Sequence, residues 1–214
     1  MTHEWLNIFS VLAVFTLAIV SPGPNFLLVV STALGDSRRA GIFTALGVAT
    51  GSGLFAAAGL LGLILVINAL PHFATAVALL GGGYLAWLGV TMIAHLFRRR
   101  ATVPVEAGAG RSGRSPLQAY RAGLITNLTN PKAWAFYFSL FTLVMAPGAP
   151  LWEKIFLNGA MFLISFGWYA LVALLISERR VQPLFLRVQP AIQALLGVLL
   201  VGLGGRLALG SLFG

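Results

Sequence analysis

The chain has no cysteine and very little charge, and each absence excludes a class of protein. Without cysteine there is no disulfide, no thiolate nucleophile and no thiolate metal site. Only 9% of the 214 residues are charged, against about a quarter in an ordinary soluble domain, and 58% are hydrophobic. The mean hydropathy of +0.92 leaves too little polar surface to coat a water-soluble globule. The sequence therefore predicts a membrane protein whose surroundings are the lipid bilayer.

Acidic residues are the scarcest charged type, and all five lie at the ends of apolar runs or in loops. The 14 Lys and Arg residues occupy short gaps between apolar runs rather than amphipathic stretches with interleaved aromatics. This placement does not indicate nucleic-acid binding. The sequence also has no His/Glu metal set, no Gly-x-Ser-x-Gly element and no intramembrane Asp pair, so we expect no metal, no cofactor and no enzyme activity.

Six apolar runs are each long enough to cross the hydrocarbon core, which takes about 20 helical residues. They cover approximately residues 5–34, 41–70, 73–97, 119–146, 155–177 and 190–213. The longest polar segment separates the third run from the fourth and is typical of a loop. We therefore predict an all-α integral membrane protein with six transmembrane helices in one domain, 1–214. Its parts are a first repeat over about 1–97, a cytoplasmic loop over about 98–118 and a second repeat over about 119–214.

Arginine is concentrated in alternate gaps between the runs. Three gaps on one predicted side hold Arg38 and Arg39, then six arginines from Arg98 to Arg121, then Arg179, Arg180 and Arg187. The gaps on the other side hold only Lys154. The positive-inside rule places the arginine-rich loops in the cytoplasm, so both termini are predicted to face outward.

Two proline-containing breaks lie at matching places in the two halves. The first run is interrupted at residues 21–25 and the fourth at residues 126–132, and Pro24 and Pro131 are 107 positions apart, half of 214. Because each half has an odd number of spans, the second half must be inserted upside down. Inverted three-helix repeats with the first and fourth helices broken are typical of secondary transporters, with the site near the midplane. Tolerated proline kinks in a helical bundle are the alternative.

The chemistry of the breaks suits a zwitterion. Ser21-Pro22 and Asn130-Pro131 each have the pattern of a cap followed by a new half-helix, whose free amides favour an anion such as a carboxylate. Unwound carbonyls can accept an ammonium group. Asparagine and threonine side chains could add hydrogen bonds or could simply satisfy the interrupted backbone. The candidate substrate-binding residues are Ser21, Pro22, Gly23, Pro24, Asn25, Asn127, Thr129, Asn130, Pro131, Lys132, Trp134 and Tyr137.

Lys132 is the only Lys or Arg predicted well inside a span. An ammonium in the membrane core costs at least about 2.5 to 3.5 kcal/mol on insertion scales, so its presence asks for a compensating contact or a function. The alternative is that the Lys132 side chain snorkels, or pairs with helix-end carbonyls, and serves structure only. Since Lys132 follows a predicted half-helix start, our hypothesis is that it receives a substrate carboxylate and also loses and regains a proton during transport.

Several motifs together resemble the LysE/RhtB family of amino-acid exporters over nearly the whole chain. They are Ser21 to Asn25, the spacing Gly41…Gly47…Gly51, and above all Gly123 to Ala133. The segment Ser112 to Ser115 and the pair Trp168-Tyr169 are most similar to the threonine-exporter branch. The resemblance implies export of small amino acids by proton antiport, in a bacterial inner-membrane protein that forms a homodimer.

Two departures from the family pattern narrow the range of expected substrates. The family often has Asp after Pro-Gly-Pro and an acidic residue in the fifth segment, but here these places hold Asn25 and an uncharged stretch at residues 163–166. A carboxylate proton relay therefore has no carrier, and a cationic substrate would have no counter-charge. Neutral amino acids such as threonine or homoserine fit better. A channel or structural bundle without coupled transport is the alternative, and a shortage of His-rich or acidic tracts disfavours metal export.

The predicted topology can be tested with single cysteines, because the chain has none of its own. In intact cells, Ser112→Cys is expected to be protected from an impermeant thiol reagent, and Pro147→Cys is expected to be labelled. Labelling of Ser112→Cys from outside would contradict the orientation.

Overall fold

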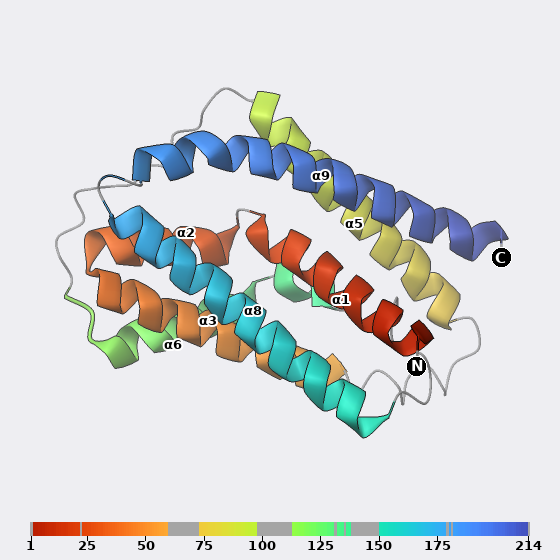
Figure 1. Ribbon diagram of the computed structural model, residues 1–214, viewed down its shortest axis with the longest axis horizontal. Helices are drawn as coiled ribbons and strands as arrows, with labels where there is room; N and C mark the ends of the chain where they lie inside the picture. The colour runs from red at the N-terminus through yellow and green to blue at the C-terminus, as the bar shows by residue number, and fades with distance from the viewer. Residues whose placement is uncertain are drawn as a thin grey trace.

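A computed structural model describes residues 2–21, 23–59, 73–97, 113–130, 132–134, 136–137, 150–178, 180 and 182–213 (Figure 1). Its main elements are α1 (Thr2–Val20), α2 (Pro24–Gly35), α3 (Arg38–Ala58), α5 (Phe73–Phe97), α6 (Pro116–Thr129), α8 (Leu151–Ser177) and α9 (Gln182–Phe213). Each of these elements is a helix, and no strand occurs in the ranges just given. The predicted all-α fold class is thereby confirmed.

Several of the helices are compatible with a membrane span by length and composition. Arg38–Ala58, Leu151–Ser177 and Pro183–Arg206 each pass this test alone. Trp5–Val20 and Pro24–Gly35 pass it only together, as a pair bent by 56° at the break, which is the geometry of a broken span or of a re-entrant loop. The predicted runs also include residues 60–70 and 138–146, which lie outside the described residues, so the count of six spans and the inverted repeat stay predictions.

Helices α5 and α9 pack side by side in opposite directions, as Figure 1 shows. Glycines make this contact close on both sides. A Cβ added to Gly82 would lie 2.7 Å from the Gly204 carbonyl oxygen, and one added to Gly204 would meet the backbone of Gly82. Gly89 and Gly197 approach each other in the same reciprocal way. Small residues let helix backbones approach in a membrane, where van der Waals packing replaces the hydrophobic effect between helices.

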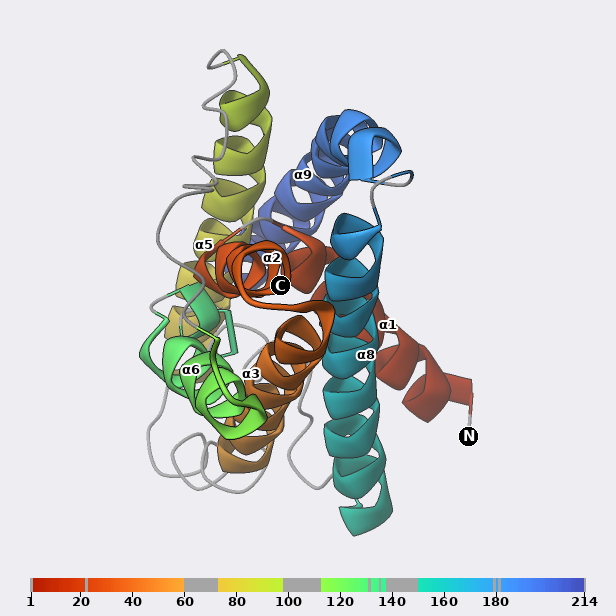
Figure 2. The same ribbon diagram turned by 90° about the vertical axis from the view of Figure 1, so that its left-hand side faces the viewer.

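Helix α3 lies between α6 and α8 (Figure 2). The contact with α6 again depends on glycine, because a Cβ on Gly47 would meet the Tyr120 carbonyl and one on Gly123 would meet the Thr44 carbonyl. Gly51 continues this face, with an added Cβ only 2.8 Å from the Asn127 side-chain oxygen. The glycines that the sequence places four residues apart therefore face a neighbouring helix.

Helix ends that flank the arginine-bearing gaps share one end of the bundle. The turn from α2 to α3, the start of α6, the end of α8 and the start of α9 lie at that end, whereas the start of α1 and the end of α9 lie at the other (Figure 1). Arg114, just before α6, donates to the Thr32 hydroxyl at 3.2 Å and lies 3.7 Å from an Asp36 carboxylate oxygen. This contact joins the start of α6 to the end of α2. Which end faces the cytoplasm stays a prediction.

Two apolar clusters fill the bundle, and a polar layer lies between them. The first cluster includes Phe15, Leu85 and Met161, and the second includes Val29, Val48 and Val172. Buried polar side chains that fall outside these clusters include Ser21, Asn25, Ser52, Asn127, Asn130 and Ser165. The two breaks of the sequence contribute four of these six residues.

Capping residues rather than hydropathy fix where several helices begin. Ser115 forms a capping box with Gln118, so α6 begins at Pro116, three residues before the predicted apolar run. Ser37 caps α3 by accepting from the Ala40 amide at 3.1 Å. Helix α9 begins at Gln182, well before the predicted start at 190, and runs through Pro190. The apolar runs therefore mark the hydrophobic parts of longer helices.

Close packing of α3 on α6 gives a stability prediction. Gly47→Leu should lower the yield and the melting temperature of purified protein, because overpacking costs about 1 to 3 kcal/mol or more where backbone must move. Gly159→Leu on α8 is the matched control, since Gly159 is exposed and an added Cβ there meets nothing within 4 Å. Equal melting temperatures for the two variants would contradict the packing.

Candidate functional site

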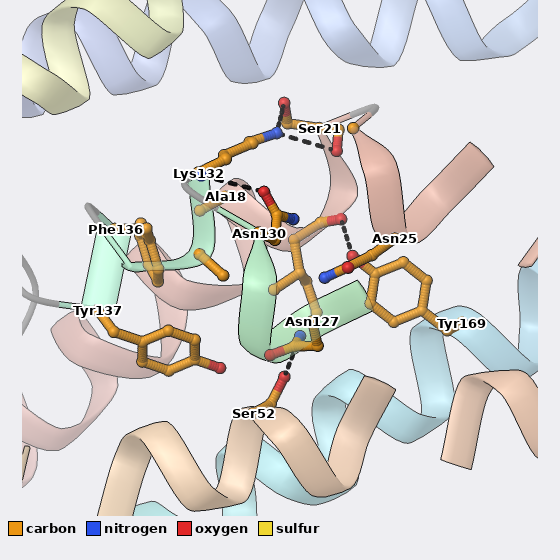
Figure 3. Close-up of a pocket in the computed structure, with 13 residues that line it drawn as sticks. Ala18, Ser21, Asn25, Ser52, Asn127, Asn130, Lys132, Phe136, Tyr137 and Tyr169 are labelled. Atoms are coloured by element: carbon orange, nitrogen blue, oxygen red, sulfur yellow. Dashed lines mark hydrogen bonds between the residues drawn. The ribbon is translucent and has the colours of Figure 1, made fainter. Parts of the chain in front are cut away.

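A pocket opens where the two breaks meet, and about 430 Å³ of space, open solvent included, lies between its lining atoms. Figure 3 shows that side chains from both breaks point into this region together with side chains from α3 and α8. The lining residues are Ala18, Ile19, Ser21, Gly23, Asn25, Ser52, Asn127, Asn130, Lys132, Ala133, Phe136, Tyr137 and Tyr169.

The first break differs from its predicted form. The sequence predicted Ser21 as the cap of a half-helix beginning at Pro22, and this is wrong. The new half-helix, α2, begins at Pro24, and its N-cap is Gly23, which has an extended backbone and no side-chain cap. A residue that precedes proline is biased towards extended conformations, so Pro24 keeps Gly23 out of the helix. Pro22 itself lies outside the described residues.

The second break has the predicted cap. Asn130 is extended, with φ −75° and ψ 110°, and its side-chain oxygen accepts from the Lys132 amide at 3.0 Å. Its carbonyl accepts from the Trp134 amide at 3.1 Å, which starts the next helical turn. Asn130 is therefore the N-cap of a second half-helix, as its position before Pro131 predicted. Pro131 lies outside the described residues.

The side chain of Lys132 crosses from the second break to the first. Its ammonium donates to the Ser21 hydroxyl at 2.5 Å and to the Ser21 carbonyl oxygen at 3.3 Å. Ser21 is 3% exposed, and the contact with the half-buried Lys132 side chain is part-buried. The lysine backbone is held as well, because the Tyr84 hydroxyl donates to the Lys132 carbonyl at 3.1 Å. A cation from one break is therefore bound by unwound backbone of the other.

Gly23 gives the lysine side chain its room. A Cβ on Gly23 would lie 3.3 Å from Lys132 Cδ and 3.4 Å from its Nζ. The helices before the breaks end 109 positions apart, at Val20 and Thr129. The N-caps after the breaks, Gly23 and Asn130, lie 107 positions apart, which is also the spacing of Pro24 and Pro131.

Ser52 lies at the centre of a buried hydrogen-bond network. Its hydroxyl lies 3.1 Å from the Ser165 hydroxyl, and the Asn127 side-chain amide donates to it at 3.4 Å. These contacts join α3, α6 and α8. They fix one wall of the pocket, because buried polar groups with satisfied partners have few alternative arrangements.

Two buried amide oxygens lack a hydrogen-bond partner among the described residues. They are the side-chain oxygens of Asn25, which is 7% exposed, and of Asn127, which is 2% exposed. A buried acceptor without a donor costs about 1 to 3 kcal/mol, so each of them would gain from a ligand that donates. Both residues line the pocket, and one comes from each break.

The structure brings together seven of the predicted binding residues in the pocket wall: Ser21, Gly23, Asn25, Asn127, Asn130, Lys132 and Tyr137. Pro24, Thr129 and Trp134 do not line it. Thr129 is exposed and donates to the Ile125 carbonyl of its own helix. Trp134 is 59% exposed, and its indole donates to the Leu128 carbonyl at 2.7 Å.

Sequence reasoning missed the wall that comes from intact helices. Ser52 on α3 and Tyr169 on α8 line the pocket although neither lies near a break. The Tyr169 hydroxyl donates to the Ile19 carbonyl at 3.4 Å, just before the first break. Tyr169 belongs to the aromatic pair that carried part of the family resemblance, whereas Trp168 does not line the pocket. Ser52 is a single serine between Gly51 and Gly53, and this pattern alone does not indicate a binding residue.

The pocket carries positive charge without an acidic partner in its wall. None of the described lining residues is Asp or Glu, and Lys132 is the one charged residue in that set. The described residues also contain no group of three or more His, Cys, Asp or Glu that could hold a metal ion. The wall therefore suits a ligand with a negative group and additional hydrogen-bond donors.

These observations define an all-helical protein, in the described residues, with several apolar helices compatible with a membrane and a pocket where the two breaks meet. Comparison with known families gives the more specific identification. The LysE type translocator family matches residues 16–211, so the chain belongs to that family. The resemblance drawn from the motifs is confirmed. No solved structure matches the chain.

Curated relatives of the chain are named as efflux proteins. The threonine efflux protein of Salmonella typhi is 30% identical over 198 residues, which cover 92% of this chain and 94% of the relative. The threonine efflux protein of Escherichia coli K12 is 30% identical, with 91% and 94% covered. The leucine efflux protein of Enterobacter sp. strain 638 is 29% identical, with 89% of each chain covered. The family and these names point to transport rather than catalysis.

Proposed function

We propose that this protein exports small neutral amino acids, threonine or homoserine or a similar one, from the cytoplasm by proton antiport. It would work in the bacterial inner membrane as a homodimer, with six spans in inverted repeats and both termini outside. The relatives named for threonine and leucine efflux support the substrate class. Its neutral character is supported by a pocket wall in which no described residue is acidic.

One observation carries the proposal: a single pocket holds a lysine ammonium and two buried amide oxygens that have no hydrogen-bond partner among the described residues. An amino acid is a zwitterion, so it needs a cation for its carboxylate and acceptors for its ammonium. Both kinds of group lie in the same pocket. The second break supplies Lys132 and the first supplies Ser21, which binds it, while the two amide oxygens come one from each break. A purely structural lysine would not require unpartnered acceptors beside it.

The carboxylate is assigned to Lys132 and to the first turn of α2. Charge-assisted hydrogen bonds are roughly twice as strong as neutral ones, so Lys132 supplies the main attraction. Helix α2 begins at the pocket with no side-chain cap, which leaves its first amides for a ligand. A helix N-terminus adds a favourable dipole for a carboxylate.

The ammonium is assigned to the side-chain oxygens of Asn25 and Asn127. An ammonium group supplies three donors, enough to satisfy both oxygens that lack partners among the described residues. Neutral acceptors suit a group that must also leave, because a carboxylate in their place would hold the ammonium more strongly. Asn25, which stands where the family often has Asp, therefore fits transport of a zwitterion.

The side chain of the substrate is assigned to the apolar wall. Ala18, Ala133 and Phe136 line this part of the pocket and are nearly fully buried. Phe136 and Tyr137 pack against Phe15, with ring centroids 6.2 Å and 6.0 Å from it. A wall of packed rings resists expansion, so we expect a preference for small side chains.

The transport assignment is tested with purified protein in proteoliposomes that carry an imposed pH gradient, using radiolabelled threonine, homoserine, serine and leucine. Lys132→Met is expected to lower uptake at least tenfold while the protein still folds and inserts, because the carboxylate loses its cation. Asn25→Leu is expected to weaken uptake as well, through the loss of an ammonium acceptor.

Lys154→Met is the matched control, because Lys154 is the other lysine of the chain and lies near the start of α8. It is expected to transport like the wild type. Normal transport by Lys132→Met would disprove the carboxylate role. If the wild type accumulates none of the four amino acids, the assigned substrate class is wrong. A flux that neither saturates with substrate concentration nor exchanges substrate across the membrane would indicate a channel.

Proton coupling is tested separately with Lys132→Arg. Arginine keeps the positive charge and does not lose its proton in proteins. If Lys132 carries the proton, this variant should still bind substrate but should not couple uptake to the pH gradient. Coupled transport by Lys132→Arg would remove Lys132 as the proton carrier and leave the carboxylate role intact.

A further inference from the structure

The Lys132 ammonium donates to two uncharged groups of Ser21. It lies 2.5 Å from the Ser21 hydroxyl and 3.3 Å from the Ser21 carbonyl oxygen. Both acceptors are buried with Ser21 at the end of α1, on the opposite break from the lysine. The lysine that the proposed function assigns to the substrate carboxylate is therefore engaged by the protein itself.

A carboxylate can take the ammonium away from Ser21. In surroundings of low dielectric constant, attraction between opposite charges exceeds attraction between a charge and a neutral acceptor. The exchange replaces one set of contacts by another, so the lysine keeps a partner throughout. An acidic residue in place of Ser21 would remove this advantage, because protein and substrate would then offer the same kind of acceptor.

The absence of a side chain at Gly23 leaves space for the Lys132 side chain. This side chain passes over Gly23, where an added Cβ would lie 3.3 Å from Cδ and 3.4 Å from Nζ. Lysine carries its charge on a flexible four-carbon stem, so its ammonium can shift while its backbone stays fixed. The backbone is fixed here by the Asn130 cap and by the Tyr84 hydroxyl.

We propose that Ser21 is a competing acceptor, which holds the Lys132 ammonium until a substrate carboxylate displaces it. This inference rests on the proposed carboxylate role of Lys132 and assigns Ser21 a positioning role instead of direct contact with substrate. Ser21 then lowers substrate affinity and makes the carboxylate obligatory. An amino acid amide carries the ammonium group but cannot release the lysine, so it is not a ligand.

Binding to the purified full-length protein tests the competition. The probe is whichever of radiolabelled threonine, homoserine, serine and leucine the wild type binds most tightly. Ser21→Ala is expected to lower the Kd roughly fivefold, because one charge-assisted hydrogen bond no longer opposes the substrate. Ser21→Asp is expected to raise the Kd more than tenfold, because its carboxylate would hold Lys132 in an ion pair.

The matched control is Ser10→Ala on the same helix. The Ser10 hydroxyl is exposed and donates to the Leu6 carbonyl at 2.7 Å, so its loss should leave the Kd unchanged. Ser21→Gly removes the same hydroxyl and replaces Ser21→Ala if that variant does not elute as a monodisperse protein. Threonine amide is expected not to compete with the radiolabelled probe.

The two substitutions at Ser21 separate competition from direct binding. If Ser21 contacted the substrate, Ser21→Ala would weaken binding, and this result would overturn the inference, as would an unchanged Kd. Binding of the probe to Ser21→Asp with wild-type affinity would also overturn it. Failure of the wild type to bind any of the four amino acids would instead refute the proposed function on which the inference rests.

Discussion

The buried ammonium of Lys132 is the constraint on which the rest of the site depends. A cation in the core of a membrane costs at least about 2.5 to 3.5 kcal/mol on insertion scales, so it needs acceptors at the same depth. A regular helix cannot supply them, because its carbonyls are already hydrogen-bonded within the helix. The break after Val20 frees the Ser21 carbonyl and presents its hydroxyl to Lys132. The first break therefore supplies the acceptors that the Lys132 ammonium of the second break requires.

Close packing of the intact helices stabilises the fold and offsets the backbone hydrogen bonds lost at the two breaks. Gly47 and Gly123 bring α3 against α6, and Gly82 and Gly204 bring α5 against α9. These contacts are between backbones, so they hold the frame rigidly while the broken helices contribute less regular structure. The Ser52 network then ties the frame to the pocket. A site with a defined wall can in this way be built from unwound segments.

Hydropathy and capping patterns in the sequence predicted the helices and one of the two caps. Packing between helices determined which other residues line the pocket. The apolar runs predicted helices, and Asn130 before a proline predicted the cap that the structure has. The first break was predicted two residues too early, because Pro22 and Pro24 both suit a helix start and only the extended Gly23 decides between them. Ser52 and Tyr169 lie in intact helices away from both breaks, and it is helix packing that brings them to the pocket.

The central claim is that one zwitterion bridges groups contributed by both breaks. A structure determined with a bound transported amino acid tests it most directly. We predict the substrate carboxylate within hydrogen-bond distance of Lys132 Nζ, and the substrate ammonium on the side-chain oxygens of Asn25 and Asn127. An amino acid bound elsewhere, with Lys132 still on Ser21 and both amide oxygens without a ligand, would contradict the account.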